Sequence, residues 1–312
     1  MGRIRPEPVK LVRWAVLISA LVPLAAQESV IRVNVRLVRL LVTVKDAKGG
    51  LVGTLNKNNF SVYDNGAKQE IAVFEHHTDQ PLSIAVLFDT SASVGIALKY
   101  EVESATRFLH AVLREGNPDD QVSLYSFNWE VRAQTGFTRR TERLERALHT
   151  MRAEGGTSLY DAIYLASQDM ERREGRHVII VVTDGGDTTS YKDFHAALDA
   201  AQRADAVIYP ILVMPIKNDA GRNIGGENAL TTLSNGTGGM VFTPNLGPGL
   251  DEAFDDILRA LRTQYLLGFY PKDVPLTKNR FHQLRVSPDR QGLRVITRSG
   301  YYGDSEEPPR RR

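Results

Sequence analysis

The chain has 312 residues, of which 42% are hydrophobic and 24% charged, a balance typical of a folded globular protein. It contains no cysteine, which excludes a disulfide framework, a thiolate metal site and a lipid anchor on cysteine. The formal net charge is +2, and residues 1–26 hold four basic residues and one acid, so the rest of the chain carries −1 and lacks the basic excess of nucleic-acid-binding proteins.

The first 26 residues are typical of a secretory signal peptide. Four basic residues precede an apolar run over residues 14–26 that ends in small residues, and we expect cleavage after Ala26. The run is 13 residues long and contains Pro23, whereas a membrane-spanning helix needs about 20 residues. We therefore expect a secreted or periplasmic protein. An uncleaved membrane anchor is the alternative.

Residues 28–80 have the pattern of an all-β segment. Apolar and polar residues alternate over most of residues 30–44, which predicts a strand with one solvated face. Further strands are predicted over residues 59–63 and 69–74, and the sequence Asp-Asn-Gly at 64–66 predicts a tight hairpin turn between them. We expect a small β-sandwich or part of one.

Strands and helices alternate over residues 82–262. Unbroken apolar runs at 84–88 and 177–183 predict strands that are buried on both faces. Further strands are predicted over 121–127, 131–137, 206–213 and 239–243, and helices over 97–114, 141–151 (capped by Thr141), 158–172, 191–204, 227–234 and 250–262. This alternation predicts a doubly wound α/β domain with a mostly parallel sheet.

Residues 263–303 return to a β pattern, with strands predicted over 265–270, 281–286 and 293–298. Three strands bury too little surface alone, so we expect them to pack with residues 28–80 as one β domain into which the α/β domain is inserted. Two independent β units are the alternative. Residues 304–312 are predicted to be a disordered tail.

Three loops of the α/β domain carry side-chain oxygens that suit a hard cation. The first holds Asp89, Ser91 and Ser93, the second Thr157 and the third Asp184. Because ligands of open α/β sheets bind at the carboxyl ends of the strands, we expect the first and third loops to be neighbours there. A site with only oxygen donors favours magnesium.

Each of these residues, taken singly, also has an ordinary structural explanation. Ser93 and Thr157 stand near predicted helix starts, where serine and threonine are common caps, and Asp184 is compatible with a turn. The agreement of three loops favours the cation site. Asp187 is a candidate to hold the cation's ligands in place without binding the cation itself, and a turn or a helix cap explains it equally well.

The three loops resemble the metal-ion-dependent adhesion site of von Willebrand factor type A domains, through Asp89-Thr90-Ser91-Ala92-Ser93, Gly156-Thr157 and Thr183-Asp184-Gly185. The resemblance covers residues 82–262, and the flanking β segments resemble those of secreted bacterial proteins that carry a related domain. It implies that Ser91 and Ser93 bind the cation directly and that Thr157 binds it directly or through water. Asp89 and Asp184 would act mostly through waters. The implied ion is Mg²⁺, or else Mn²⁺ or Ca²⁺.

The resemblance implies a secreted module that grips an acidic residue of a protein partner through the cation. A metal-assisted hydrolase at the same site is one alternative, but no histidine is close to the three loops in sequence to act as a general base. A structural envelope protein with a degenerate site is the other, and the presence of all five ligand types argues against it. We therefore expect no enzymatic activity and no nucleic-acid partner.

Other motifs in the chain favour structural explanations. His76-His77 has no partner at metal-ligand spacing, the glycines of 221–226 lack the lysine of a phosphate loop, and Ser158 lacks the histidine and acid of a catalytic triad. The aromatic pairs Phe269-Tyr270 and Tyr301-Tyr302 are predicted to pack the β domain, with an exposed binding patch as the alternative.

Overall fold

The computed structural model describes residues 37–76, 80–95, 97–213, 223–274 and 281–303. The predicted signal peptide and C-terminal tail lie outside these residues, as do His77 and Gly221. Of the helices in the described ranges, none is long and apolar enough to cross a lipid bilayer.

The α/β domain is built on a five-stranded sheet in the order β7-β6-β5-β8-β9. Its strands are β5 (Leu82–Asp89), β6 (Gln121–Phe127), β7 (Val131–Thr138), β8 (Arg176–Thr183) and β9 (Ala206–Leu212). All pairings are parallel except that of β7, which runs antiparallel at one edge. The predicted strand over 239–243 is wrong, because that segment makes only an isolated bridge from Phe242 to Ile211 beside β9.

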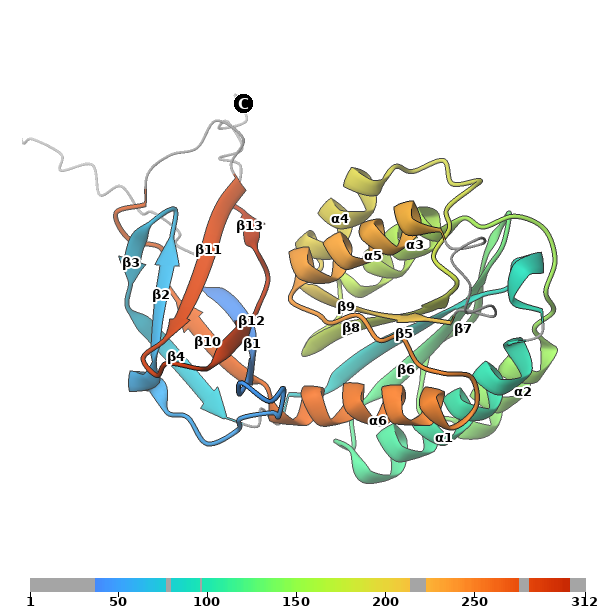
Figure 1. Ribbon diagram of the computed structural model, residues 1–312, viewed down its shortest axis with the longest axis horizontal. Helices are drawn as coiled ribbons and strands as arrows, with labels where there is room; N and C mark the ends of the chain where they lie inside the picture. The colour runs from blue at the N-terminus through green and yellow to red at the C-terminus, as the bar shows by residue number, and fades with distance from the viewer. Residues whose placement is uncertain (1–36, 77–79, 96, 214–222, 275–280, 304–312) are drawn as a thin grey trace, which may run out of the picture. The chain divides into compact units, whose positions relative to one another are not determined.

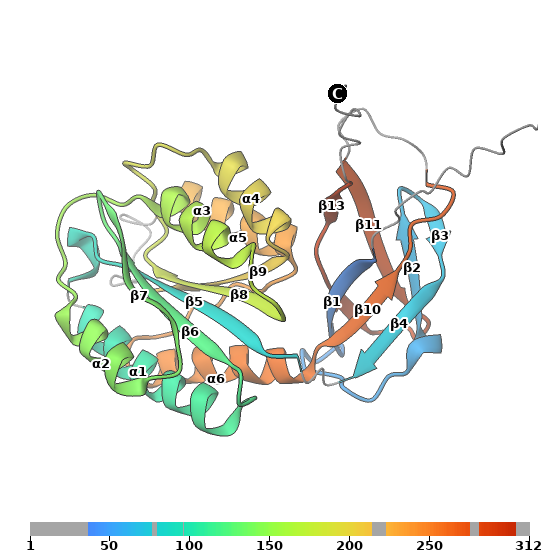
Figure 2. The ribbon, with the colours of Figure 1, turned by 180° about the vertical axis from the view of Figure 1, so that it is seen from behind.

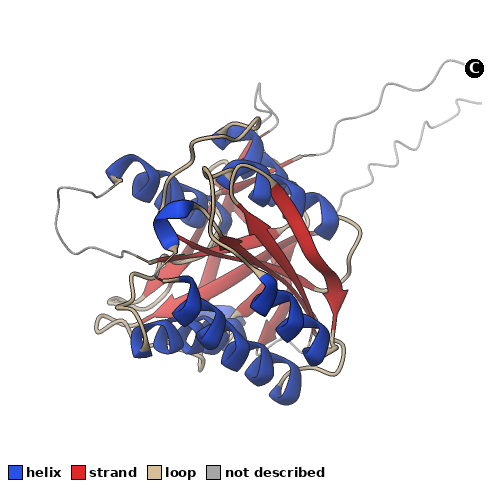
Figure 3. Ribbon diagram, turned by 90° about the vertical axis from the view of Figure 1, so that its right-hand side faces the viewer, coloured by secondary structure: helices blue, strands red, loops and turns tan. Residues whose placement is uncertain are grey.

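Helices cover both faces of this sheet (Figures 1 and 3). One face carries α1 (Leu98–Glu115), α2 (Thr141–Thr150) and α6 (Pro248–Thr263), and the other carries α3 (Leu159–Met170), α4 (Phe194–Arg203) and α5 (Ile224–Thr237). The central strand β5 explains this arrangement, because Ile84 and Phe88 enter one core while Ala85 and Leu87 enter the other. The predicted doubly wound fold is confirmed.

Several helix boundaries differ from the sequence prediction by one to three residues, and those of α2 and α5 have a clear physical reason. Thr141 is the first residue of α2 rather than its cap, and the capping position is held by Arg140. Helix α5 is longer than predicted, starting after Asn223, whose side chain accepts a hydrogen bond from the Gly226 amide. Glycine lowers helix propensity, so the glycines of this segment hid the helix from a pattern-based prediction.

The β domain consists of two four-stranded antiparallel sheets, β12-β1-β10-β4 and β13-β11-β2-β3 (Figures 1 and 2). The N-terminal segment supplies β1 (Val38–Lys45), β2 (Phe60–Asp64), β3 (Ala67–Gln69) and β4 (Ile71–His76), and the C-terminal segment supplies β10 (Tyr265–Phe269), β11 (Phe281–Pro288), β12 (Arg294–Ile296) and β13 (Gly300–Tyr302). Each sheet therefore mixes strands from both ends of the chain, as predicted. Side chains from both segments, such as Val62 and Phe269, fill one core.

Details of the β segments correct two predicted strands. The strand predicted over 69–74 is two strands, because the chain leaves one sheet after β3 and joins the other at β4. The strand predicted over 293–298 is limited to β12. The turn at 64–66 is confirmed, since Asn65 and Gly66 both have positive φ, at 45° and 84°, as a tight hairpin of this kind requires. Two short 3-10 helices, Lys57–Asn59 and Ala92–Val94, complete the described elements.

Candidate metal centre

The ends of two adjacent parallel strands bring the first and third loops together. Phe88 of β5 lies opposite Val182 of β8, so the next residues, Asp89 and Thr183, end their strands side by side. The Thr183 hydroxyl donates a hydrogen bond of 2.6 Å to Asp89 Oδ2. Asp184 follows directly and is half-buried.

The first loop folds its hydroxyl groups toward one another. Asp89 Oδ1 accepts a hydrogen bond of 2.8 Å from the Ser91 amide, and the hydroxyls of Ser91 and Ser93 lie 3.0 Å apart. Ser91 stands at the start of the 3-10 helix Ala92–Val94 but makes no capping bond with its side chain, and α1 begins only after Ala97. The capping explanation therefore does not account for the two serine hydroxyls.

The second loop is tied to the first by backbone hydrogen bonds. The Glu154 amide donates to the Thr90 carbonyl at 2.8 Å, and the Ala92 amide donates to the Gly155 carbonyl at 3.2 Å. These bonds hold the segment before Thr157 against the loop of Ser91 and Ser93. Thr157 is buried just before α3, and its neighbour Ser158 occupies the helix-capping position without a side-chain capping bond.

The segment after Asp184 is bonded to the second loop as well. The Thr157 carbonyl accepts hydrogen bonds from the amides of Thr188 and Thr189, at 2.8 and 3.1 Å. Asp187 Oδ1 accepts from the Tyr160 amide, in the first turn of α3, at 3.2 Å and from the Ser190 hydroxyl at 2.5 Å. For Asp187, these contacts match the turn and helix-cap explanation.

Acidic groups at this end of the sheet are held out of water. Asp89 is fully buried, and this burial raises its pKa to about 6, although hydrogen bonds from Thr183 and Ser91 act in the opposite direction. Glu101, in the first turn of α1, is also fully buried. Burial and the charges of Asp89 and Asp184 raise its pKa to about 8.

Sequence reasoning missed Glu101, although a signal was present. In the predicted helix 97–114, positions 97 and 105 belong to the apolar inner face, and position 101 lies four residues from each. Residues four apart lie on the same face of a helix, so a carboxylate at this position faces the interior. An acidic residue on the apolar face of a helix is unusual, and it makes Glu101 a candidate for a functional role.

The donors that meet here fit a hard cation that retains water. Within the described ranges, no group of three or more histidine, aspartate or glutamate side chains is arranged to hold a metal ion alone. A cation bound here would need the serine and threonine hydroxyls and its own waters, which is how magnesium commonly binds. The paired hydroxyls of Ser91 and Ser93 beside the buried Asp89 are compatible with that need.

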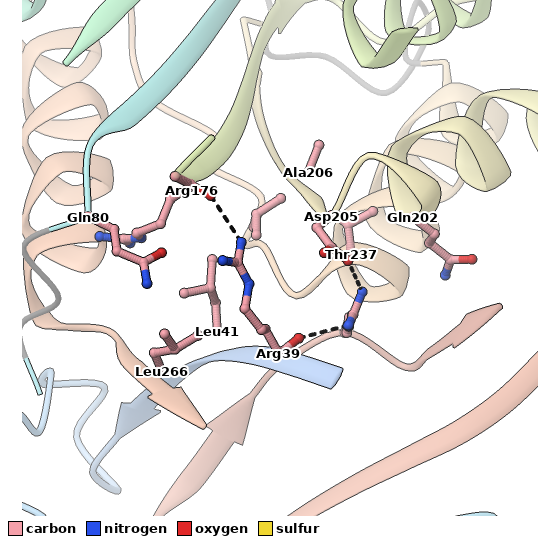
Figure 4. A pocket seen from close by; sticks show the side chains of 12 residues that line it. Arg39, Leu41, Gln80, Arg176, Gln202, Asp205, Ala206, Thr237 and Leu266 are labelled. Atoms are coloured by element: carbon pink, nitrogen blue, oxygen red, sulfur yellow. Dashed lines mark hydrogen bonds and ion pairs between the residues drawn. The ribbon is translucent and has the colours of Figure 1, made fainter. Parts of the chain in front are cut away.

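A separate cavity lies at the opposite, amino-terminal ends of β8 and β9 (Figure 4). Its volume of about 30 Å³ is enough for one or two waters. The arginines around it serve the structure, since Arg39 donates to the Gly175 carbonyl at 3.1 Å and Arg298 donates to the Arg39 carbonyl at 2.7 Å and pairs with Asp205. The three loops therefore remain the best candidate for a functional site.

Comparisons with known proteins identify one family. A sequence model of the von Willebrand factor type A domain matches residues 83–255, more than half of the chain. The chain is similar to the vWF domain of the type V pili tip protein Mfa5 from Porphyromonas gingivalis, with 16% identity and a TM-score of 0.49 over 59% of this chain and 96% of that one.

Two further solved structures are similar. For the conserved hypothetical protein BatB from Bacteroides thetaiotaomicron, the identity is 17% and the TM-score 0.46, over 58% of this chain and 97% of that one. For the pilus adhesin SpaC from Lactobacillus rhamnosus GG in its open conformation, the values are 11% and 0.49, over 83% and 47%. A comparison with curated protein sequences found no match.

Proposed function

The chain belongs to the von Willebrand factor type A family, and we propose that it is a secreted protein-binding module that grips a carboxylate of a protein partner through a divalent cation. The ion is Mg²⁺, with Mn²⁺ or Ca²⁺ as the alternatives. The observation that carries this proposal is the meeting of Asp89, Ser91 and Ser93 with the loops of Thr157 and Asp184 at one end of the sheet.

The roles of the residues follow from their chemistry. Ser91 and Ser93 offer neutral hydroxyls for direct contact with the ion, and Thr157 offers a third, directly or through water. Asp89 and Asp184 supply negative charge, and Asp89 is held in place by Thr183 and the Ser91 amide. Bound here, the cation would supply an electrophilic position for a carboxylate oxygen of the partner.

Exposed aromatic side chains beside the site favour a protein partner. Trp129, which follows β6, is 63% exposed, and its ring lies against the position of Gly155 in the second loop. Tyr191, which follows the third loop, is 97% exposed. Aromatic residues of this kind are common anchors of protein interfaces, and they would contact the partner around its carboxylate.

Binding rather than catalysis is the proposed activity. Asp89 accepts hydrogen bonds from two neutral groups, the Thr183 hydroxyl and the Ser91 amide, and the groups that bind the ion directly would be hydroxyls. Hydrolytic metal sites depend on a general base and use a strongly activated water. We therefore propose no enzymatic role for this centre.

Partner capture in the presence and absence of a chelator tests this function. The immobilised protein is incubated with an envelope extract of the producing cells, in Mg²⁺ or in EDTA, beside a Ser93→Ala variant and a Ser287→Ala control on β11. We expect a partner that wild type and Ser287→Ala retain in Mg²⁺ only and that Ser93→Ala loses. Replacing one acidic residue of that partner by its amide abolishes capture. Equal recovery in Mg²⁺ and EDTA would contradict the proposal.

A further inference from the structure

Glu101 is a buried acidic residue near the candidate site, and it is not one of the five predicted ligands. It is 0% exposed, and neither of its carboxyl oxygens has a hydrogen-bond partner among the described residues. Other buried polar side chains nearby are bonded, as Asp89 is to Thr183 and Ser91. A buried carboxyl group without hydrogen-bond partners is strongly unfavourable unless something else compensates it.

The charged neighbours of Glu101 make its position more costly still. In the described part of the chain, the charges that shift its pKa are those of Asp89 and Asp184, and both act in the same direction as burial. Burial and these two charges therefore favour the neutral form of the Glu101 carboxyl when no cation is bound. A divalent cation would stabilise the ionised forms of these three acidic groups, which disfavour one another's ionisation in its absence.

The fold places Glu101 directly after the first loop. The 3-10 helix Ala92–Val94, which contains Ser93, leads within a few residues into α1, and the Glu101 amide is bonded back to the Ala97 carbonyl at 3.1 Å. The first turn of α1 therefore carries an acidic side chain into the interior, close enough to Asp89 and Asp184 for their charges to raise its pKa. An exposed acid on the same helix, Glu103, instead pairs with Lys99 at the surface.

We propose that Glu101 is a third acidic member of the cation site, accepting hydrogen bonds from the water molecules of the bound ion. This inference rests on the proposed function, because it requires that the centre binds a divalent cation. A role through water agrees with the lack of a tight group of carboxylates in the described residues. Water-mediated acceptors of this kind orient the ion's ligands and raise the affinity for the metal.

Calorimetric titration with Mg²⁺ and with Mn²⁺ tests the role of Glu101. The proteins are the wild type, Glu101→Gln, which keeps the shape and removes the charge, and the matched control Glu103→Gln from the exposed side of α1. We expect Glu101→Gln to bind either ion about tenfold more weakly than the wild type, the lower end of the effect known for such outer partners. Glu103→Gln should match the wild type.

Thermal unfolding of the metal-free proteins separates this role from a structural one. Since Glu101 has no hydrogen-bond partner to lose in the part of the chain that the structure describes, Glu101→Gln should unfold at the same temperature as the metal-free wild type or higher. Unchanged metal affinity in Glu101→Gln, or a loss of affinity that comes with a lower metal-free unfolding temperature, overturns the inference. If the wild type itself binds neither ion, the proposed function fails, and the inference fails with it.

Discussion

The hydroxyl of Thr183 holds the Asp89 carboxylate in position. It donates to Asp89 Oδ2 at 2.6 Å and accepts from the Gly185 amide at 3.1 Å, so one side chain joins the end of β5 to the turn after β8. Asp89 and Thr183 are both fully buried. Loss of such a bond leaves a buried carboxylate partly unsatisfied, which typically costs 1–3 kcal/mol.

Thr183→Val therefore lowers the free energy of unfolding by about 1–3 kcal/mol, because valine keeps the shape and removes the hydroxyl. Urea unfolding measures this loss. The matched control is Thr231→Val, on α5, where an exposed hydroxyl donates to the Glu227 carbonyl. It should change stability by less than about 0.5 kcal/mol. Equal effects of the two substitutions would show that the Thr183–Asp89 hydrogen bond contributes no more to stability than an exposed one.

At the residue scale, the sequence predicted which loops lie together but not how their residues are bonded. Asp89, Ser91, Ser93, Thr157 and Asp184 could be named because residue type, order and position at strand ends all agreed. The hydrogen bonds of the Thr183 hydroxyl depend on side-chain positions, which cannot be read from the sequence pattern. Glu101 was missed because a single acidic residue on a helix is normally assigned to the exposed face.

Helix α5 and the loop of Asp184 are in unusually close contact. A Cβ atom added at Gly226, in the first turn of α5, would lie 1.4 Å from the Gly185 carbonyl oxygen. The backbone of Gly185, at φ +101°, occupies that space in a conformation that favours glycine. The start of α5 thus fixes the position of the loop that carries Asp184.

Gly226→Ala forces this loop away from α5, so we expect a lower unfolding temperature and weaker binding of Mg²⁺. Gly225→Ala is the control, because its Cβ would meet only the Asn223 side chain, at 3.6 Å. Alanine is the better helix former, so the control should be neutral or slightly stabilising, by up to about 1 kcal/mol. Differential scanning fluorimetry with and without Mg²⁺ compares the pair. Identical behaviour of the two variants would contradict a positioning role for α5.

At the element scale, buried strands and amphipathic helices followed the sequence closely. The apolar runs of β5 and β8 predict these strands clearly, since strands buried on both faces need apolar residues throughout. Boundaries were less predictable where the chain changes partner, as between β3 and β4, which pair with different sheets. A change from one sheet to another depends on tertiary packing, so the hydrophobic periodicity of the sequence does not reveal it.

At the scale of the whole molecule, the β domain depends on both ends of the chain. Strand β10 lies between β1 and β4 in one sheet, and β11 lies beside β2 in the other. The discontinuous domain could be predicted because neither segment buries enough surface alone. The strand order and register could not, because they depend on pairings between residues more than 200 positions apart.

A single residue links the last helix of the α/β domain to the β domain. Gln264 lies between α6 and β10 and is fully buried. Its Nε2 donates to the Thr43 hydroxyl at 3.1 Å and to the Tyr209 hydroxyl at 3.0 Å, while Arg176 donates to its Oε1. Strands β1, β8 and β9 are therefore bonded to the same junction, which gives α6 a fixed end.

Direct measurement of divalent-cation binding tests whether the three loops form a metal site. Isothermal titration of the protein with Mg²⁺ should show one saturable site per chain that EDTA reverses. Ser91→Ala should abolish or strongly weaken it, because the serine hydroxyl is one of the proposed direct ligands, while Ser287→Ala on β11 should leave it unchanged. Absence of Mg²⁺, Mn²⁺ and Ca²⁺ binding in the wild type, or equal binding in Ser91→Ala, would show that these loops do not form the proposed cation site.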